Sequence, residues 1–176
     1  KEAIGDGSAW GVEVSYSHEP EAEPLETGGA IAQAIDWFRN KPFILVAADI
    51  WTEYDYAQLR PLTDDESAHL ILANKPHWAR KSDFNLDADN KITHDEQSGY
   101  TFAGIAVIHP VMWSTQQPGR YPITKVLANP IIQKSISGSL CNMPWFNIGC
   151  IERLSELCKY LGITTQQTNY HRVSAT

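Results

Sequence analysis

Three side chains that carry oxygen atoms stand where strands are predicted to end or a helix to begin. Asp49 directly follows the apolar run 43–48, and Asn74 directly follows the apolar run 68–73. In open α/β sheets, ligands bind outside the carboxyl ends of the strands, and a divalent cation stabilises a carboxylate placed there. Asp49 is therefore a candidate metal ligand, although Asp is also a common cap of a following helix. Asn147 stands just before the last predicted helix, which it could cap, or it could reach into a site.

A second candidate ligand site is the start of the helix predicted for residues 27–38. Thr27 is a good N-cap, and Gly28 and Gly29 follow it. Two glycines destabilise a first turn. They also let a flat or charged ligand approach the backbone at the positive end of the helix dipole. The alternative is that the glycines only give the cap conformational freedom.

Residues 85–96 approximate a calcium-binding loop of the EF-hand type, because oxygen-bearing side chains stand at its first, third, fifth and twelfth positions. Asn90 replaces the usual glycine at the sixth position, and the residues that follow predict a strand instead of an exiting helix. We therefore predict that residues 84–93 form a β-hairpin that turns at Asp89 and Asn90, since both residue types tolerate positive φ. Calcium binding is the alternative.

The elements that must position these residues follow an α/β order. Continuous apolar runs such as 43–48 predict strands buried on both faces, the pattern of a parallel sheet. Gly104 interrupts one strand, which indicates close approach by a ligand or by another backbone. The predicted strands are 12–17, 43–48, 68–73, 100–109 and 136–141, and the predicted helices are 27–38, 52–59, 121–134 with a break at Pro130, and 151–161.

Composition limits the classes of function. A chain of 176 residues with 43% hydrophobic and 20% charged residues is ordinary for one globular domain. The net charge of −7 argues against a nucleic-acid-binding surface. No apolar run approaches the ~20 residues that cross a bilayer. The three cysteines form no C-x-x-C pair, which suits a reducing compartment and argues against zinc. We expect a cytoplasmic protein without nucleic-acid or membrane partners, as a monomer or weak homo-oligomer.

Several different short motifs follow one another along the chain in a characteristic order. They are residues 5–12, 16–17, 24–31, 49–52, 101–105, 145–149 and 152–154. Together they resemble the sugar nucleotidyltransferases, also called NDP-sugar pyrophosphorylases. The resemblance implies a Rossmann-like α/β fold, with a mixed, mainly parallel sheet, flanking helices and a small hairpin insertion. It also implies a single nucleotidyltransferase domain over residues 1–161 and a polar tail over 162–176.

Members of this family join a nucleoside triphosphate to a sugar 1-phosphate and release pyrophosphate, with Mg²⁺ as cofactor. Leu-Glu-Thr-Gly-Gly at 25–29 and Asp-x-Trp-Thr at 49–52 are typical of members that use UTP and N-acetylmuramate 1-phosphate in peptidoglycan recycling. Two alternatives stay open: a mannose-1-phosphate guanylyltransferase, and a domain that binds sugar nucleotides without turnover.

The resemblance also assigns site residues. Asp49 is the expected catalytic residue and Mg²⁺ ligand, with Asn147 as a second ligand. The expected nucleotide-binding residues are Glu26, Thr27, Gly28, Gly29, Ala47 and Asp49. The expected sugar-binding residues are Asn74, Asp83, Thr101 and Gly104.

The chain departs from the family pattern in three places. No Gly-x-Gly-x-Arg segment for the triphosphate occurs in the sequence, so we expect an N-terminally shortened member without the first strand of the family. Asn147 stands where the family usually has Asp, and a neutral amide binds a metal more weakly. The loop 74–84 is one residue longer than its counterpart, which leaves the register of Asn74 and Asp83 open.

Overall fold

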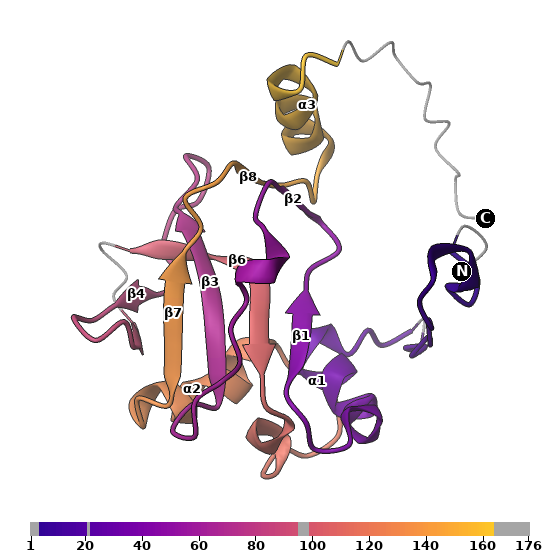
Figure 1. Cartoon of the computed structure of the whole chain (residues 1–176), viewed down its shortest axis with the longest axis vertical. Helices are drawn as coiled ribbons and strands as arrows, with labels where there is room; N and C mark the ends of the chain where they lie inside the picture. Colours follow the sequence, from indigo (N-terminus) through magenta and orange to yellow (C-terminus); the bar gives the residue numbers. More distant parts are fainter. Residues whose placement is uncertain (1–3, 21, 95–98, 164–176) are drawn as a thin grey trace.

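The computed structural model describes residues 4–20, 22–94 and 99–163. Its centre is a four-stranded sheet in the order β1-β6-β3-β7 (Figure 1). The strands are β1 (Phe43–Val46), β6 (Tyr100–Ile108), β3 (Ala68–Asn74) and β7 (Ile136–Leu140). β3 and β7 are parallel, whereas β6 is antiparallel to both of its neighbours. The sheet is therefore mixed, as predicted. Three strands share one direction, but the reversed β6 makes two of the three pairings antiparallel, so the prediction that the sheet is mainly parallel was wrong.

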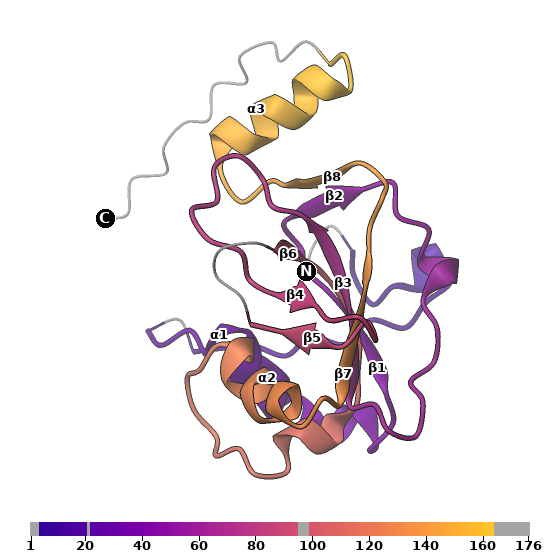
Figure 2. The same cartoon turned by 90° about the vertical axis from the view of Figure 1, so that its left-hand side faces the viewer.

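One face of the sheet is covered by helices, which lie together on one side of it (Figure 2). These are α1 (Glu26–Gln33) and α2 (Ile123–Ile132), with short 3-10 helices at Ile35–Phe38 and Pro110–Trp113. Leu127 of α2 is fully buried in the same cluster as Leu70 and Ile108 of the sheet. α2 continues through Pro130, where a break was predicted. Burial of this apolar face supplies most of the helix stability in such a layered fold.

The other face of the sheet carries a smaller core. Its buried members are Ile71, Ala73, Ala103, Ile105 and Cys141. Partly buried side chains from the segment after β1 and from Trp145 pack against it. That segment forms strand β2 (Ile50–Thr52) and a 3-10 helix (Tyr56–Gln58), where one helix over 52–59 was predicted. β2 pairs antiparallel with β8 (Trp145–Asn147), and α3 (Ile151–Tyr160) packs on β8 at the end of the molecule away from α1 and α2 (Figures 1 and 2).

The strand predicted at 43–48 is shorter and less buried than expected. β1 is paired only with β6 among the described residues, and its side chains alternate between half-buried and exposed. Ile44 is 57% exposed and Val46 is 45% exposed. An apolar run does not show by itself whether both faces of a strand are covered, so burial on both faces was a wrong prediction for this segment.

The strand predicted at 12–17 is also absent from the described residues, which place this segment outside any helix or strand. Val12 is 56% exposed. Alternation of apolar and polar residues produces a strand only where a neighbouring edge offers hydrogen bonds, because an unpaired strand is not stable in water.

The predicted hairpin is confirmed. β4 (Asn85–Leu86) pairs antiparallel with β5 (Ile92–Thr93), and Asn90 has φ 57° in the turn between them. One carboxylate oxygen of Asp87 accepts hydrogen bonds from the backbone N–H groups of Asp89 and Lys91, at 3.0 and 2.9 Å. Asp87, the first aspartate of the calcium-loop pattern, therefore stabilises the turn through these hydrogen bonds. Glu96, the last residue of that pattern, lies outside the described residues.

No helix within the described ranges is long and apolar enough to span a membrane. Residues 164–176, most of the predicted tail, lie outside the described residues, and the division into one domain at 1–161 stays a prediction.

Candidate functional site

A cleft of about 1060 Å³ opens between the start of α1, the end of β1, the loop after β3 and the bent part of β6. Most of the residues that the sequence proposed for a site line it, although they come from distant parts of the chain. These are Glu26, Thr27, Ala47, Asp49, Asp83, Thr101, Gly104 and Asn147. The fold therefore brings members of the predicted nucleotide-binding, metal-binding and sugar-binding sets to one cavity, although Gly28, Gly29 and Asn74 do not line it.

Asp49 and Asn147 meet because β2 pairs with β8. The register sets Ile50 opposite Asn147, and the N–H of Ile148 donates to the carbonyl of Asp49 at 2.7 Å. The Asn147 side-chain amide then donates to the Asp49 carboxylate, with 3.0 Å between Nδ2 and Oδ2. A strand and not a helix follows Asp49, so the carboxylate does not serve as a helix cap.

The Asp49 carboxylate is exposed to the cleft and fits the role of a Mg²⁺ ligand. Among the described residues, no group of three or more His, Cys, Asp or Glu side chains could hold a metal ion. Mg²⁺ needs no such cage, because it keeps several waters and is held by one or two carboxylates together with substrate phosphates. Asn147 is less suited than predicted, because it turns its N–H₂ group and not its carbonyl oxygen toward Asp49.

Arg153 of α3 holds the Asn147 amide in this orientation. Its Nη1 donates to the Asn147 side-chain oxygen, which also accepts from the backbone N–H of Gly149 at 3.2 Å. The guanidinium lies over the ring of Trp78, with 3.5 Å between its central carbon and the ring centroid. Sequence reasoning did not assign a role to Arg153 or Trp78, because 75 residues separate them in the chain.

Another part of the cleft lining is built around Asp83. Its carboxylate accepts hydrogen bonds from the Thr101 hydroxyl and from the backbone N–H of Phe102. Asp83 and Thr101, two of the four predicted sugar-binding residues, are thus joined by a hydrogen bond that fixes both side chains. Asn74, by contrast, is exposed at the end of β3 and does not line the cleft.

Gly104 lies at a bulge in β6 and has φ +76°, a conformation that glycine adopts readily. A Cβ there would lie 2.7 Å from the Cβ of Ala47, and the Gly104 carbonyl accepts from the Ala47 N–H at 2.7 Å. Of the two explanations for this glycine, the structure supports close approach by another backbone. The bulge also frees the Ala103 carbonyl, which accepts from the Trp145 indole at 2.8 Å.

The glycines of α1 face away from the cleft. A Cβ on Gly28 would lie 2.6 Å from the Tyr121 ring, and one on Gly29 would lie 2.1 Å from the Gly119 carbonyl oxygen. Close packing against residues 119–122 therefore requires both glycines. The helix begins at Glu26, which has φ 60° and accepts from Arg120 at 2.9 Å, so Thr27 is not its cap.

The cleft also contains residues that the sequence did not single out. Lys81, Ser82, His94 and Thr124 line it together with Trp78. Lys81 belongs to the basic pair at 80–81 in the loop after β3. A basic pair that follows the carboxyl end of a buried strand is a signal that could have marked this loop as part of an anion site.

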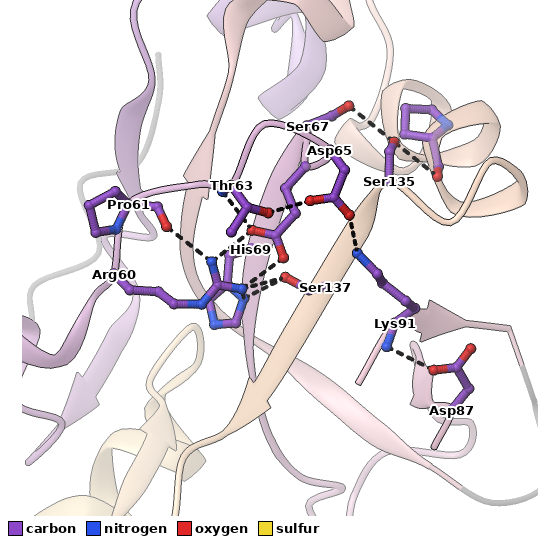
Figure 3. A network of polar contacts seen from close by, with 12 residues as sticks. Arg60, Pro61, Thr63, Asp65, Ser67, His69, Asp87, Lys91, Ser135 and Ser137 are labelled. Carbon is purple, nitrogen blue, oxygen red and sulfur yellow. Dashed lines mark hydrogen bonds and ion pairs between the residues drawn. The ribbon is translucent and has the colours of Figure 1, made fainter. Parts of the chain in front are cut away.

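A second pocket of about 550 Å³ lies along β7. Several of the residues that line it belong to a polar network, which Figure 3 shows. The Arg60 guanidinium donates to both oxygens of Glu66 at 2.7 Å and to the Ser137 hydroxyl at 3.0 Å. His69 Nδ1 lies 2.7 Å from the same hydroxyl, and its Nε2 lies 3.1 Å from Ser139 Oγ. The hydrogen bonds from Arg60 hold the pKa of Glu66 far below its ordinary value. Burial lowers the pKa of His69, and the charge of Arg60 lowers it further.

The lowered pKa of His69 predicts acid sensitivity. Below its ordinary pKa of 6.5, the unfolded chain binds a proton at this residue more readily than the folded chain does. The free energy of unfolding should therefore fall as pH falls from 6.5 toward the folded pKa, by at most about 1.4 kcal/mol per pH unit. Urea unfolding at pH 7.5 and 5.5 measures the loss, and His69→Gln should reduce it. An equal loss in His69→Gln would contradict this assignment.

Comparisons with known proteins agree with this geometry. Residues 1–86 match the nucleotidyl transferase family. The chain is 34% identical over 163 residues to the N-acetylmuramate alpha-1-phosphate uridylyltransferase of Neisseria meningitidis serogroup B, which covers 89% of this chain and 70% of that protein.

Solved structures show the same fold. A putative glucose-1-phosphate thymidylyltransferase from Bacillus anthracis superposes with a TM-score of 0.72 at 17% identity, over 89% of this chain and 68% of that one. The inositol-1-phosphate CTP transferase from T. maritima gives 0.67 at 14% identity, over 92% and 69%. On the strength of the curated relative, the chain belongs to the nucleotidyl transferase family and is a sugar-phosphate nucleotidyltransferase.

Proposed function

We propose that this chain transfers the uridylyl group of UTP to N-acetylmuramate 1-phosphate, in the recycling of peptidoglycan. The observation that carries the proposal is the single cleft that unites Glu26, Asp49 and Asp83. The similarity to the Neisseria uridylyltransferase supports the choice of base and sugar. An oxygen of the sugar phosphate attacks the α-phosphorus of UTP, a new P–O bond forms, and the bond to the β-phosphate breaks to release pyrophosphate.

The sugar phosphate is already a nucleophile, so the protein must mainly position the two substrates and neutralise charge. Asp49 would hold Mg²⁺, which when bound neutralises phosphate charge and stabilises the charge that develops on the leaving pyrophosphate. Lys81 lines the same cleft and would add a cationic side chain that attracts the phosphates of the substrates. Removal of water from the cleft strengthens these interactions.

The two substrates would occupy opposite parts of the cleft. Glu26, Thr27 and Ala47 would border the nucleotide, with Glu26 held by Arg120. Gly28 and Gly29 would act indirectly, by letting α1 pack closely enough to set that wall. Asp83, Thr101 and Gly104 would line the sugar pocket, whereas Asn74 is too far along β3 to line the cleft itself.

The test is pyrophosphate release with Mg²⁺, UTP or GTP, and a panel of sugar 1-phosphates. It is run on this chain and on a version that begins at the natural start of the reading frame, if that lies upstream of Lys1. Turnover with UTP and N-acetylmuramate 1-phosphate, well above every other pair, is the expected result. Preference for GTP with mannose 1-phosphate would replace the proposal by a guanylyltransferase. Nucleotide binding without turnover in either version would make the protein a sugar-nucleotide-binding domain.

A further inference from the structure

Arg153 contacts two residues that line different parts of the cleft, Trp78 and Asn147. The flat side of its guanidinium covers Trp78, which belongs to the loop between β3 and β4. The edge of the same guanidinium donates to Asn147, which donates in turn to Asp49. Lys81 and Asp83 lie in the Trp78 loop and also line the cleft. One side chain of α3 thus contacts the loop between β3 and β4 and, through the Asn147 amide, the Asp49 carboxylate.

The orientation of the Asn147 amide follows from its three neighbours. Its oxygen lies against two donors, the Arg153 guanidinium and the Gly149 N–H, and its N–H₂ group lies against the Asp49 carboxylate. Turning the amide over would place N–H groups against both donors and an oxygen against a carboxylate. Only the orientation with the oxygen toward Arg153 satisfies all three contacts.

We propose that Arg153 is a positioning residue that clamps Trp78 and fixes Asn147 as a hydrogen-bond donor to Asp49. Asn147 then orients the carboxylate and is not itself a metal ligand. This inference rests on the proposed function for the metal role of Asp49. A second contact supports the clamp, because His77 of the same loop lies 3.7 Å from the Glu156 carboxylate of α3. The contact between this loop and α3 and the orientation of Asp49 therefore depend on the same arginine.

The first test measures metal binding without any substrate, with Mn²⁺ as the probe and electron paramagnetic resonance of free Mn²⁺ as the readout. Asp49→Asn should weaken Mn²⁺ binding at least about tenfold, because it removes the carboxylate ligand. Asn147→Ala should change it by less than about threefold, because it removes a donor and no ligand. Equal weakening by Asn147→Ala and Asp49→Asn would overturn the proposed role of Asn147.

The second test measures the clamp itself through the fluorescence of Trp78. The difference between the unmodified chain and Trp78→Phe isolates the Trp78 emission from that of the other tryptophans. Arg153→Gln uncovers one face of the ring, so acrylamide quenching of this emission should rise at least about twofold. Lys159→Gln removes another cation from the same helix and is the matched control, which should leave quenching unchanged. Unchanged quenching in Arg153→Gln would overturn the clamp.

The two readouts separate failure of this inference from failure of the proposed function. If Asp49→Asn bound Mn²⁺ as tightly as the unmodified chain, the metal role of Asp49 would fail, but the quenching experiment would still decide the clamp. Where turnover is measurable, Arg153→Gln should raise KM for the sugar phosphate about fivefold, as expected for loss of one partly exposed cation–π contact. Arg153→Lys should restore less than half of this loss, because an ammonium cannot stack and donate in the same plane.

Discussion

Asp49→Asn should lower kcat/KM for pyrophosphate release by about 10²- to 10³-fold, the cost of removing one preorganised electrostatic group from a transition state. The substitution keeps the shape of the side chain and can still accept a hydrogen bond from Asn147, so the local β2–β8 pairing should survive. It removes the negative charge that a metal ion needs. The expected loss is therefore one of catalysis, with little change in melting temperature.

Asp64→Asn is the matched control for this experiment, because it removes another exposed aspartate that does not line the cleft. It should retain activity within about twofold. Steady-state kinetics at saturating Mg²⁺ and thermal unfolding by circular dichroism measure both properties on the same samples. If Asp49→Asn kept kcat/KM within about threefold of the unmodified protein, Asp49 would have no role in the chemistry.

Arg60→Ala should lower the free energy of unfolding by about 3 kcal/mol, because it leaves a buried carboxylate without its partner. The Glu66 side chain is only 4% exposed, and Arg60 donates to both of its oxygens. Arg60 itself is 42% exposed, so water can enter the space that it leaves, which places the loss at the lower end of the range for broken buried pairs. The Ser137 hydroxyl loses a donor in the same substitution.

Urea unfolding near neutral pH measures this loss, and Arg39→Ala, which removes an exposed arginine elsewhere, should cost less than about 0.5 kcal/mol. The stabilisation from Glu66 is present above its ordinary pKa of 4.5 and is lost as pH falls toward its lowered folded pKa. Arg60→Ala should therefore also reduce the acid sensitivity below pH 4.5. A loss under 1 kcal/mol at neutral pH would mean that the network adds little to stability.

Long apolar runs allowed much of the fold to be predicted. β3, β6, β7 and α3 lie within one or two residues of the predicted segments. β3 and β6 are almost entirely buried apolar segments, and α3 follows the helical spacing of its apolar residues. Two predictions were wrong: burial of β1 on both faces, and a strand at residues 12–17. Both properties depend on which strands lie next to the segment. Periodicity within one segment contains no information about those neighbours.

The site was predictable only in part. Family resemblance brought Asp49, Asp83 and Thr101 together, and the cleft agrees with that grouping. The roles of Gly28 and Gly29 could not be inferred, because their close packing depends on residues more than 85 positions later in the chain. The contacts of Arg60 with Ser137 depend likewise on the parallel register of β3 and β7, which no local pattern determines.

The central position of β6 has a consequence for synthesis on the ribosome. β1 and β3 are translated before β6, yet each pairs with β6 and neither pairs with the other. At typical translation rates, the ribosome needs roughly 3 to 12 s to extend the chain from Val46 to Ile108. Throughout this interval the apolar segment at 43–46 lacks β6, the strand with which it pairs among the described residues. The β1–β6 and β3–β6 pairings therefore form only after β6 has been made, and until then the edges of β1 and β3 that face β6 stay open to pairing with other chains.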